Sequence, residues 1–236
     1  MSRVSGSSKH WYDKYYLRRG RSAPAWYDVM YRWLAKQKPD GPIVELGCGA
    51  GELLERLADD GVYMPSELYG VEQSTTGLEN ARRLGINIVD ADLSAGVPFE
   101  NASAGCVVLA EVIEHLVDAD SVLSEVDRIL RPDGVFLLSF PNYINLPWLV
   151  VRVLADMLDR PNWIVLQPVD RMYTIHAIVN KLKRAGFKVS ACFGTVYLPP
   201  ILYKWEHRYI RAAFDRLGLA DLAFHPILVC RKRRIS

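Results

Sequence analysis

The fold is decided by the stretch Ile43-Val44-Glu45-Leu46-Gly47-Cys48-Gly49-Ala50-Gly51-Glu52-Leu53-Leu54. An apolar run is followed by alternating glycines and then by apolar residues at helical spacing, which predicts a strand, a tight turn and a helix. Glycine at every second position allows positive φ and leaves no Cβ in the way of a ligand, while the helix start offers free N–H groups. We therefore expect a flat, polar ligand at this loop.

The spacing of the glycines separates two kinds of ligand. A dinucleotide fingerprint would place its third glycine at position 52, where this chain has Glu52, so the NAD interpretation is disfavoured. Glu45 places a carboxylate near the carboxyl end of the strand, where a ligand with a cationic group could meet it. The alternative is an ordinary glycine-rich turn without a ligand.

With this motif the sequence resembles the class I S-adenosylmethionine-dependent methyltransferases, whose first motif has the form E/D-x-G-x-G-x-G. The resemblance runs from about Ile43 to Asn142 and includes E-V-I-E-H-L, R-P-D-G and S-F-P-N at 111–116, 131–134 and 139–142. It implies an α/β fold with a Rossmann-like doubly wound sheet, mostly parallel with an antiparallel last strand, and S-adenosylmethionine as methyl donor. The expected cofactor-binding residues are Glu45, Gly47, Cys48, Gly49, Gly51, Glu72, Gln73, Ala91, Asp92, Leu93 and Glu111.

Two acids support this site. Glu72 ends the predicted strand 68–72, 25 residues after Gly47, near the spacing at which a strand-end carboxylate accepts hydrogen bonds from ribose hydroxyls. Asp92 follows the predicted strand 86–90, and the resemblance implies that it binds the adenine amino group beside an apolar neighbour. Thr76 and Glu79 form a possible capping box for the helix between these strands.

We expect one domain, because 236 residues that are half apolar can bury one substantial core. Within it we predict an N-terminal cap segment at 1–40, a cofactor-binding core at 41–142, an insertion at 143–169 and a C-terminal part, 170–236, that completes the sheet. Further strands are predicted at 105–110, 135–140, 187–196 and 227–230, and helices at 51–58, 174–186 and 201–217. A turn at 131–134 should separate a helix that ends near Leu130 from the strand that follows.

Charge and cysteine usage restrict the partners and the compartment. The 29 basic and 27 acidic side chains are too balanced for a protein that binds mainly phosphates, so we do not expect nucleic acid as a partner. Four dispersed cysteines without a CxxC pair, and no apolar leader, predict a cytoplasmic protein. The apolar stretch 144–158 is too interrupted to span a bilayer but could contact a membrane surface.

The chemistry is expected at Glu111-Val112-Ile113-Glu114-His115-Leu116, which follows an apolar strand at the edge where open α/β sheets bind ligands. Methyl transfer needs an acceptor held in line with the donor and, for hydroxyl acceptors, a base. His115 is the candidate base, with Glu114 as the second catalytic residue. The alternative is that His115 only caps the loop.

The same string also resembles two metal-using branches, the ubiquinone-biosynthesis O-methyltransferases and the small-RNA 3′-terminal 2′-O-methyltransferases. There, two glutamates and a histidine join a second histidine after the fifth strand. This chain has no histidine between Pro141 and Tyr173, and His176 falls on a predicted helix, so we do not expect a functional divalent metal.

Two other segments are candidates to cover the ligand. Aromatic residues and arginines between Trp11 and Trp33 could close over it, or could pack on the sheet edge. The insertion at 143–169 could form an apolar lid that binds the acceptor, or could be core. The predicted function is methyl transfer to a small-molecule or lipid-like acceptor, most simply at oxygen. The alternatives are a catalytically silent S-adenosylmethionine-binding regulator and a 2′-O-methyltransferase of an RNA end.

Overall fold

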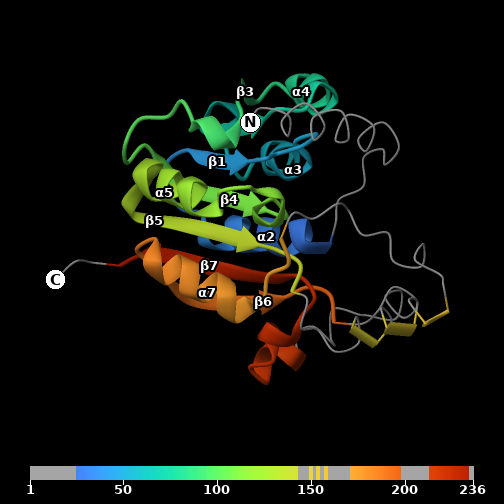
Figure 1. The fold of residues 1–236 in the computed structure, drawn as a ribbon. Helices are drawn as coiled ribbons and strands as arrows, with labels where there is room; N and C mark the ends of the chain where they lie inside the picture. The colour runs from blue at the N-terminus through green and yellow to red at the C-terminus, as the bar shows by residue number, and fades with distance from the viewer. Residues whose placement is uncertain are drawn as a thin grey trace, which may run out of the picture.

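The computed structural model describes residues 25–142, 149–150, 153–154, 157–158, 171–197 and 213–233. These residues form a seven-stranded sheet in the order β3-β2-β1-β4-β5-β7-β6 (Figure 1). Strands β1 to β5 pair in parallel, and β7 is antiparallel to both of its neighbours. The strands are β1 Ile43–Leu46, β2 Leu68–Glu72, β3 Asn87–Asp90, β4 Ala104–Ala110, β5 Leu130–Ser139, β6 Phe187–Gly194 and β7 Pro226–Lys232. The predicted mostly parallel sheet with an antiparallel last strand is confirmed.

Helices cover both faces of the sheet, and in Figure 1 α5 and α7 lie in front of it and α2 behind it. The helices are α2 Ala25–Gln37, α3 Glu52–Asp59, α4 Thr75–Arg82, α5 Ala119–Ile129 and α7 Ile175–Arg184, with single 3₁₀ turns η1 Pro65–Glu67, η2 Leu93–Ala95, η3 Ile113–His115 and η6 Ala220–Leu222. Apolar side chains of α5 and α7 share one core cluster, and those of α2 and α3 share another. The layers are therefore helix, sheet, helix.

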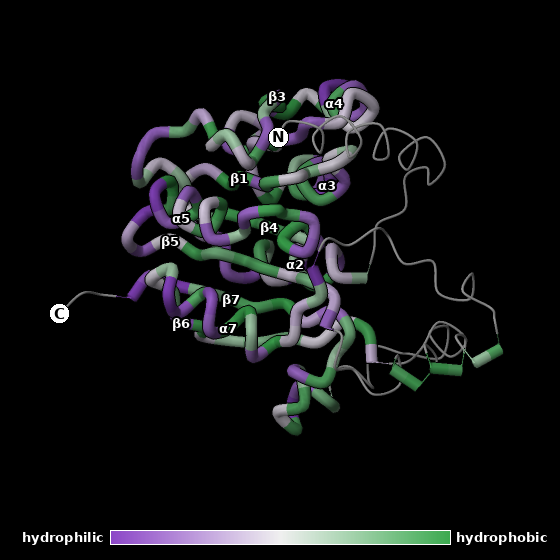
Figure 2. Tube along the Cα trace, viewed as in Figure 1, coloured by the Kyte–Doolittle hydropathy of each residue, from purple (hydrophilic) through white to green (hydrophobic). Residues whose placement is uncertain are grey.

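Strand β4 shows how the sequence produces this layering. All seven of its residues are buried. Successive side chains of a strand point to opposite faces, and accordingly Val107 and Leu109 belong to one core cluster while Cys106 and Val108 belong to the other. A strand buried on both faces must be apolar throughout, as Figure 2 shows for the centre of the molecule.

The strand order places the binding edge. The sequence runs outward from β1 to β2 and β3, then returns to β4 on the other side of β1. Ligands of open α/β sheets bind beyond the carboxyl ends of the strands at such a reversal. The glycine loop after β1 and the Glu111 segment after β4 both lie there.

Two local predictions were wrong. The cap of α4 is Ser74, whose Oγ accepts a hydrogen bond from the Gly77 N–H, and not Thr76. The stretch 131–134 is not a separate turn, because β5 begins at Leu130, which pairs with Ala104 before the register shifts.

Several predictions fall outside the described residues. They concern the aromatic and arginine-rich segment before residue 25, most of the insertion at 143–169, and the predicted helix 201–217 up to residue 212. Among the residues that are described, no helix is both long enough and apolar enough to cross a membrane.

Candidate functional site

The glycine loop after β1 has a left-handed backbone at three positions. Gly47, Gly49 and Gly51 have φ of 73°, 57° and 81°, values that favour glycine. A Cβ at Gly47 would lie 2.6 Å from Cγ2 of Val112, so glycine also lets this loop approach the segment after β4. The N–H groups of Gly47 and Cys48 both donate to the Val71 carbonyl, at 2.8 and 3.0 Å. The two loops at the strand-order reversal are therefore in contact.

Glu72 holds the glycine loop in place. Its buried carboxylate accepts hydrogen bonds from the backbone N–H groups of Gly49 at 2.8 Å, Gln73 at 2.9 Å and Ser74 at 2.8 Å. These bonds tie the loop after β1 to the start of α4. A carboxylate has about four acceptor positions, and three of those of Glu72 receive these main-chain N–H groups. The role in ribose binding stays a prediction, and the loop contact is an additional one.

Glu45 is a fully buried carboxylate on β1. Burial raises its pKa well above the usual value, the charges of Glu52 and Glu72 raise it further, and the Tyr27 hydroxyl lowers it in part. Neither carboxylate oxygen makes a hydrogen bond of ordinary geometry within the described residues. Three carboxylates thus act on one another beside the glycine loop, a setting that favours a cationic ligand and disfavours a pyrophosphate.

Cys48 faces the core with its side chain. Its Sγ lies in the cluster under α3, and a Cβ added at Gly70 would meet it at 2.5 Å. Burial raises the pKa of the Cys48 thiol well above its usual value. The predicted contact of Cys48 with a ligand can therefore involve only its main chain.

The loop after β3 lies at the same edge. The Ala91 N–H donates to the Glu72 carbonyl at 3.3 Å, which links this loop to the end of β2. Asp92 is exposed and caps η2 by accepting from the N–H and Oγ–H of Ser94, at 2.9 and 2.7 Å. Leu93 is half-buried beside it. The segment that carries Asp92 and Leu93 therefore begins beside the end of β2, and their role in adenine binding stays a prediction.

Glu111 is the centre of a network that the sequence did not indicate. It has a left-handed backbone, with φ of 56°, which is uncommon for a glutamate and is often found at functional sites. The Ser139 Oγ–H donates to Oε1 at 2.7 Å, and Nδ1 of His225 lies 2.7 Å from Oε2. The His225 ring packs against Trp26 with centroids 4.5 Å apart. The only sequence signal for His225 is its position just before the antiparallel strand β7, whose amino end lies at the carboxyl edge of the parallel strands.

The predicted catalytic pair lies in η3. Glu114 is 1% exposed, and burial, followed by the charge of Glu111, raises its pKa well above the usual value. Nε2 of His115 is buried and lies 3.7 Å from Glu114 Oε1, too far for a hydrogen bond. The catalytic roles of His115 and Glu114 stay predictions. Within the part of the chain that the structure describes, no three His, Cys, Asp or Glu side chains are grouped as metal ligands.

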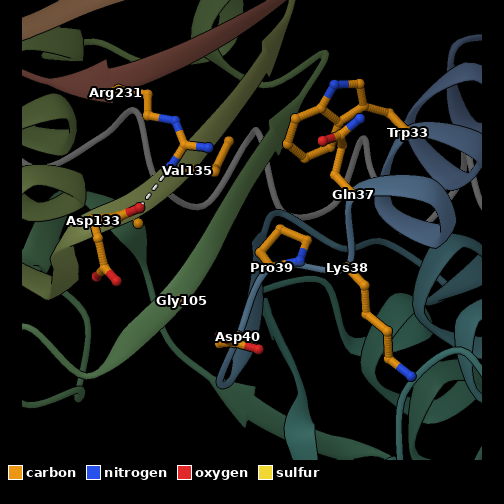
Figure 3. Close-up of a pocket in the computed structure, with 10 residues that line it drawn as sticks. Trp33, Gln37, Lys38, Pro39, Asp40, Gly105, Asp133, Val135 and Arg231 are labelled. Atoms are coloured by element: carbon orange, nitrogen blue, oxygen red, sulfur yellow. Dashed lines mark hydrogen bonds between the residues drawn. The ribbon is translucent and has the colours of Figure 1, made fainter.

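A polar hollow of about 220 Å³ lies at the opposite edge of the sheet (Figure 3). Trp33 and Gln37 from α2 lie on one side of it, and Arg231, which donates to the Asp133 carbonyl at 2.6 Å, lies on the other. Gly105 is the second residue of β4 and lies at the amino end of that strand. This hollow is therefore separate from the glycine loop, and its lining residues are Trp33, Gln37, Lys38, Pro39, Asp40, Gly105, Asp133, Gly134, Val135 and Arg231.

Known proteins are similar in sequence to the part of the chain that forms the parallel strands. Residues 44–138 match the family described as a methyltransferase domain. A probable S-adenosylmethionine-dependent methyltransferase from Mycolicibacterium smegmatis is 34% identical over 188 residues, which cover 78% of this chain and 64% of that protein. The chain thus spans less than two thirds of the length of this curated relative.

Solved structures share the fold at low sequence identity. A Thermotoga maritima protein described as a possible histamine N-methyltransferase has a TM-score of 0.64 and 17% identity, covering 99% of this chain and 100% of that one. A geranyl diphosphate C-methyltransferase from Streptomyces coelicolor has a TM-score of 0.59 and 15% identity, covering 87% and 78%. Residues 44–138 thus match a methyltransferase domain, and the sheet has the same fold as solved methyltransferases. The named acceptors differ, so the fold does not identify the acceptor.

Proposed function

We propose that the protein binds S-adenosylmethionine at the carboxyl edge of the sheet and transfers its methyl group to a small-molecule or lipid-like acceptor, most simply at oxygen. The observation that carries this proposal is the left-handed glycine loop beside the mutually interacting carboxylates Glu45, Glu52 and Glu72. Bound S-adenosylmethionine supplies a methyl group on a sulfonium. Its ammonium and sulfonium suit an anionic setting, and its hydroxyls suit Glu72.

The cofactor would be held by residues from three loops. Main-chain groups of the glycine loop would contact the ligand, and Glu45 is the buried carboxylate on the strand that precedes this loop. Glu72 with Gln73 would bind the ribose, and Ala91, Asp92 and Leu93 the adenine ring. Glu111 is the remaining predicted cofactor residue, and its side chain is already engaged by Ser139 and His225.

The acceptor is proposed to carry an apolar chain. Six described apolar residues of the stretch 149–158 are each at least 46% exposed: Leu149, Val150, Val153, Leu154, Met157 and Leu158. Exposed large apolar side chains at this density favour contact with an apolar molecule or surface. In the sequence these residues come after β5, whose last residue, Ser139, contacts Glu111.

An acceptor screen tests the proposal. Purified protein is incubated with S-adenosylmethionine and with pairs of phenols or alcohols that differ only in an attached prenyl chain, and S-adenosylhomocysteine is measured. We expect turnover of the prenylated member of a pair, and a loss of that preference in a Leu149→Ser, Val153→Ser double variant. Leu217→Ser, which removes an apolar side chain of 72% exposure elsewhere, is the matched control. Tight S-adenosylmethionine binding without turnover of any acceptor would indicate the silent regulator instead.

A further inference from the structure

We propose that His225 is the general base of the transferase, with Glu111 as the residue that positions it. This inference rests on the proposed function, since it assigns the proton acceptor for the methyl-accepting group. It replaces His115 in that role.

The contacts around Glu111 fix the orientation of His225. A carboxylate oxygen can only accept, so the 2.7 Å contact between Glu111 Oε2 and His225 Nδ1 places the ring proton on Nδ1. Ser139 occupies the other oxygen, which prevents the carboxylate from turning away. Trp26 packs on the ring face at a tilt of 32°, and Phe224 meets it edge-on with centroids 4.6 Å apart. The imidazole is thus clamped with Nε2 as its acceptor.

The position of His225 fits a base. Glu111 follows β4, Ser139 ends β5 and His225 precedes the antiparallel β7, so all three lie at the carboxyl edge of the sheet. Val112, next to Glu111, touches the glycine loop at Gly47. The His225 carbonyl accepts from the N–H and the Oγ1–H of Thr195, at 3.1 and 2.7 Å, which holds the main chain of His225, and its side chain is 13% exposed. His225 is therefore joined through Glu111 to the segment that contacts the glycine loop, and its side chain is not fully buried.

His115 is less well placed than His225. Its Nε2 is buried and faces Glu114 at 3.7 Å, so it would have to move before it could reach an acceptor. A base needs to lie within hydrogen-bond reach of the proton that it takes.

The lone pair of the acceptor atom forms the bond to the methyl carbon, the sulfur–methyl bond breaks, and its electron pair stays on sulfur, which becomes a neutral thioether. The proton of the acceptor hydroxyl passes to Nε2 of His225. The resulting imidazolium is stabilised by Glu111 and later returns the proton to solvent, and no oxidant or metal is consumed.

A spectroscopic test needs no acceptor and no cofactor. Long-range ¹H–¹⁵N correlation spectra of the histidine rings, taken where the rings are neutral, should show the His225 proton on Nδ1. In Glu111→Leu, which removes the acceptor oxygens, the proton should move to Nε2. If the neutral His225 ring of the wild-type protein carries its proton on Nε2, the assignment of the Glu111–His225 pair is wrong, whether or not the protein is a methyltransferase.

Kinetics test the catalytic step with the acceptor found in the screen. His225→Asn keeps a donor to Glu111 but lacks the base, and we expect kcat to fall by about 100-fold or more, as general bases typically contribute. His115→Asn should lose less than about fivefold, and His176→Asn, on the exposed side of α7, should be unchanged. Glu111→Gln combined with His225→Asn should be no slower than His225→Asn alone, because Glu111 acts through His225.

The outcomes are separable. Calorimetry should give the same S-adenosylmethionine affinity for His225→Asn as for the wild-type protein. If kcat of His225→Asn stays within threefold of wild type, or if His115→Asn is the slower variant, His225 is not the base. If neither the wild-type protein nor any of the variants binds S-adenosylmethionine, the proposed function is wrong.

Discussion

At neutral pH the Glu45 carboxyl must either hold a proton or carry a charge without water, because it is fully buried between neighbouring acids. Either state costs stability. A ligand ammonium would relieve that cost by favouring the ionised form. Glu45 therefore lowers the stability of the ligand-free fold and should raise the affinity for a cationic ligand. Such a loss of stability in favour of function is common at functional sites.

Glu45→Gln should stabilise the ligand-free protein increasingly as pH rises. Because the pKa of Glu45 is raised in the folded state, the folded chain binds more protons than the unfolded chain above pH 4.5, and the contribution of Glu45 to stability is lost as pH rises. Thermal unfolding between pH 5 and about 8 measures this. The exposed Glu79→Gln is the control, and a constant difference in Tm between Glu45→Gln and wild type would contradict the prediction. S-adenosylmethionine affinity should fall in Glu45→Gln.

Glu72→Ala should lower both ligand affinity and stability. We expect a loss of about 1.5–3 kcal/mol in binding free energy, because charged hydrogen bonds to hydroxyls disappear. The free energy of unfolding should also fall, since three N–H groups lose their acceptor. Calorimetry and urea unfolding separate the two effects. Unchanged affinity would remove Glu72 from the ligand site while leaving its role in the loop intact.

At the scale of elements, β1, the glycine loop and α3 form one continuous strand–turn–helix unit. Its glycines and the apolar runs that flank them are adjacent in the sequence, which is why the sequence predicts it well, although Val71 and Glu72 also hold the loop. The unit after β4 depends on distant contacts, because Glu111 is held by Ser139 at the end of β5 and by His225 just before β7. The two units meet at Gly47 and Val112.

Gly49→Ala should abolish S-adenosylmethionine binding with a modest loss of stability. The added Cβ is strained at φ of 57° and stands in the loop where the ligand must approach. Gly61→Ala is a matched control, because Gly61 is also left-handed, with φ of 64°, and has open space around it. The two variants should unfold at similar temperatures. Binding by Gly49→Ala within a few-fold of the Gly61→Ala value would rule out a ligand at this loop.

Helix α5 is fastened to the loop before β4 by a pH-sensitive pair. Two hydrogen bonds from Arg128, helped by the Val97 N–H, hold the pKa of Glu125 at about 2. The pair therefore stabilises the fold above pH 4.5 and is lost as pH falls toward 2. Glu125→Gln should cost about 1–2 kcal/mol at neutral pH after allowance for solvent screening, and nothing near pH 2. Urea unfolding at both pH values checks this, and an equal cost at both would contradict it.

At the scale of the whole molecule, residues near in sequence were easier to predict than residues brought together by the sheet. The complete burial of β4 follows from its apolar run, and the left-handed turns of the glycine loop follow from its own glycines. His225 pairs with a residue 114 positions away, and nothing in its neighbourhood signals that contact. The prediction of the α4 cap was wrong for a different reason. The Ser74 N–H donates to Glu72, which fixes where the chain turns into the helix. Ser74 and not Thr76 therefore caps α4, although both residue types are suited to that position.

The insertion of β7 between β5 and β6 also has a consequence for the order of folding. Phe136 of β5 pairs with Cys230 of β7, and β6 joins the sheet only through β7. Pairings across such sequence separations form slowly, because a long loop must close before contacts reward it. We expect the glycine loop to form early and the His225 contact late. During refolding, protection of β1 and β4 amides from hydrogen exchange should therefore precede that of β7, and the chain should gain the ability to bind its donor before it gains the ability to turn over.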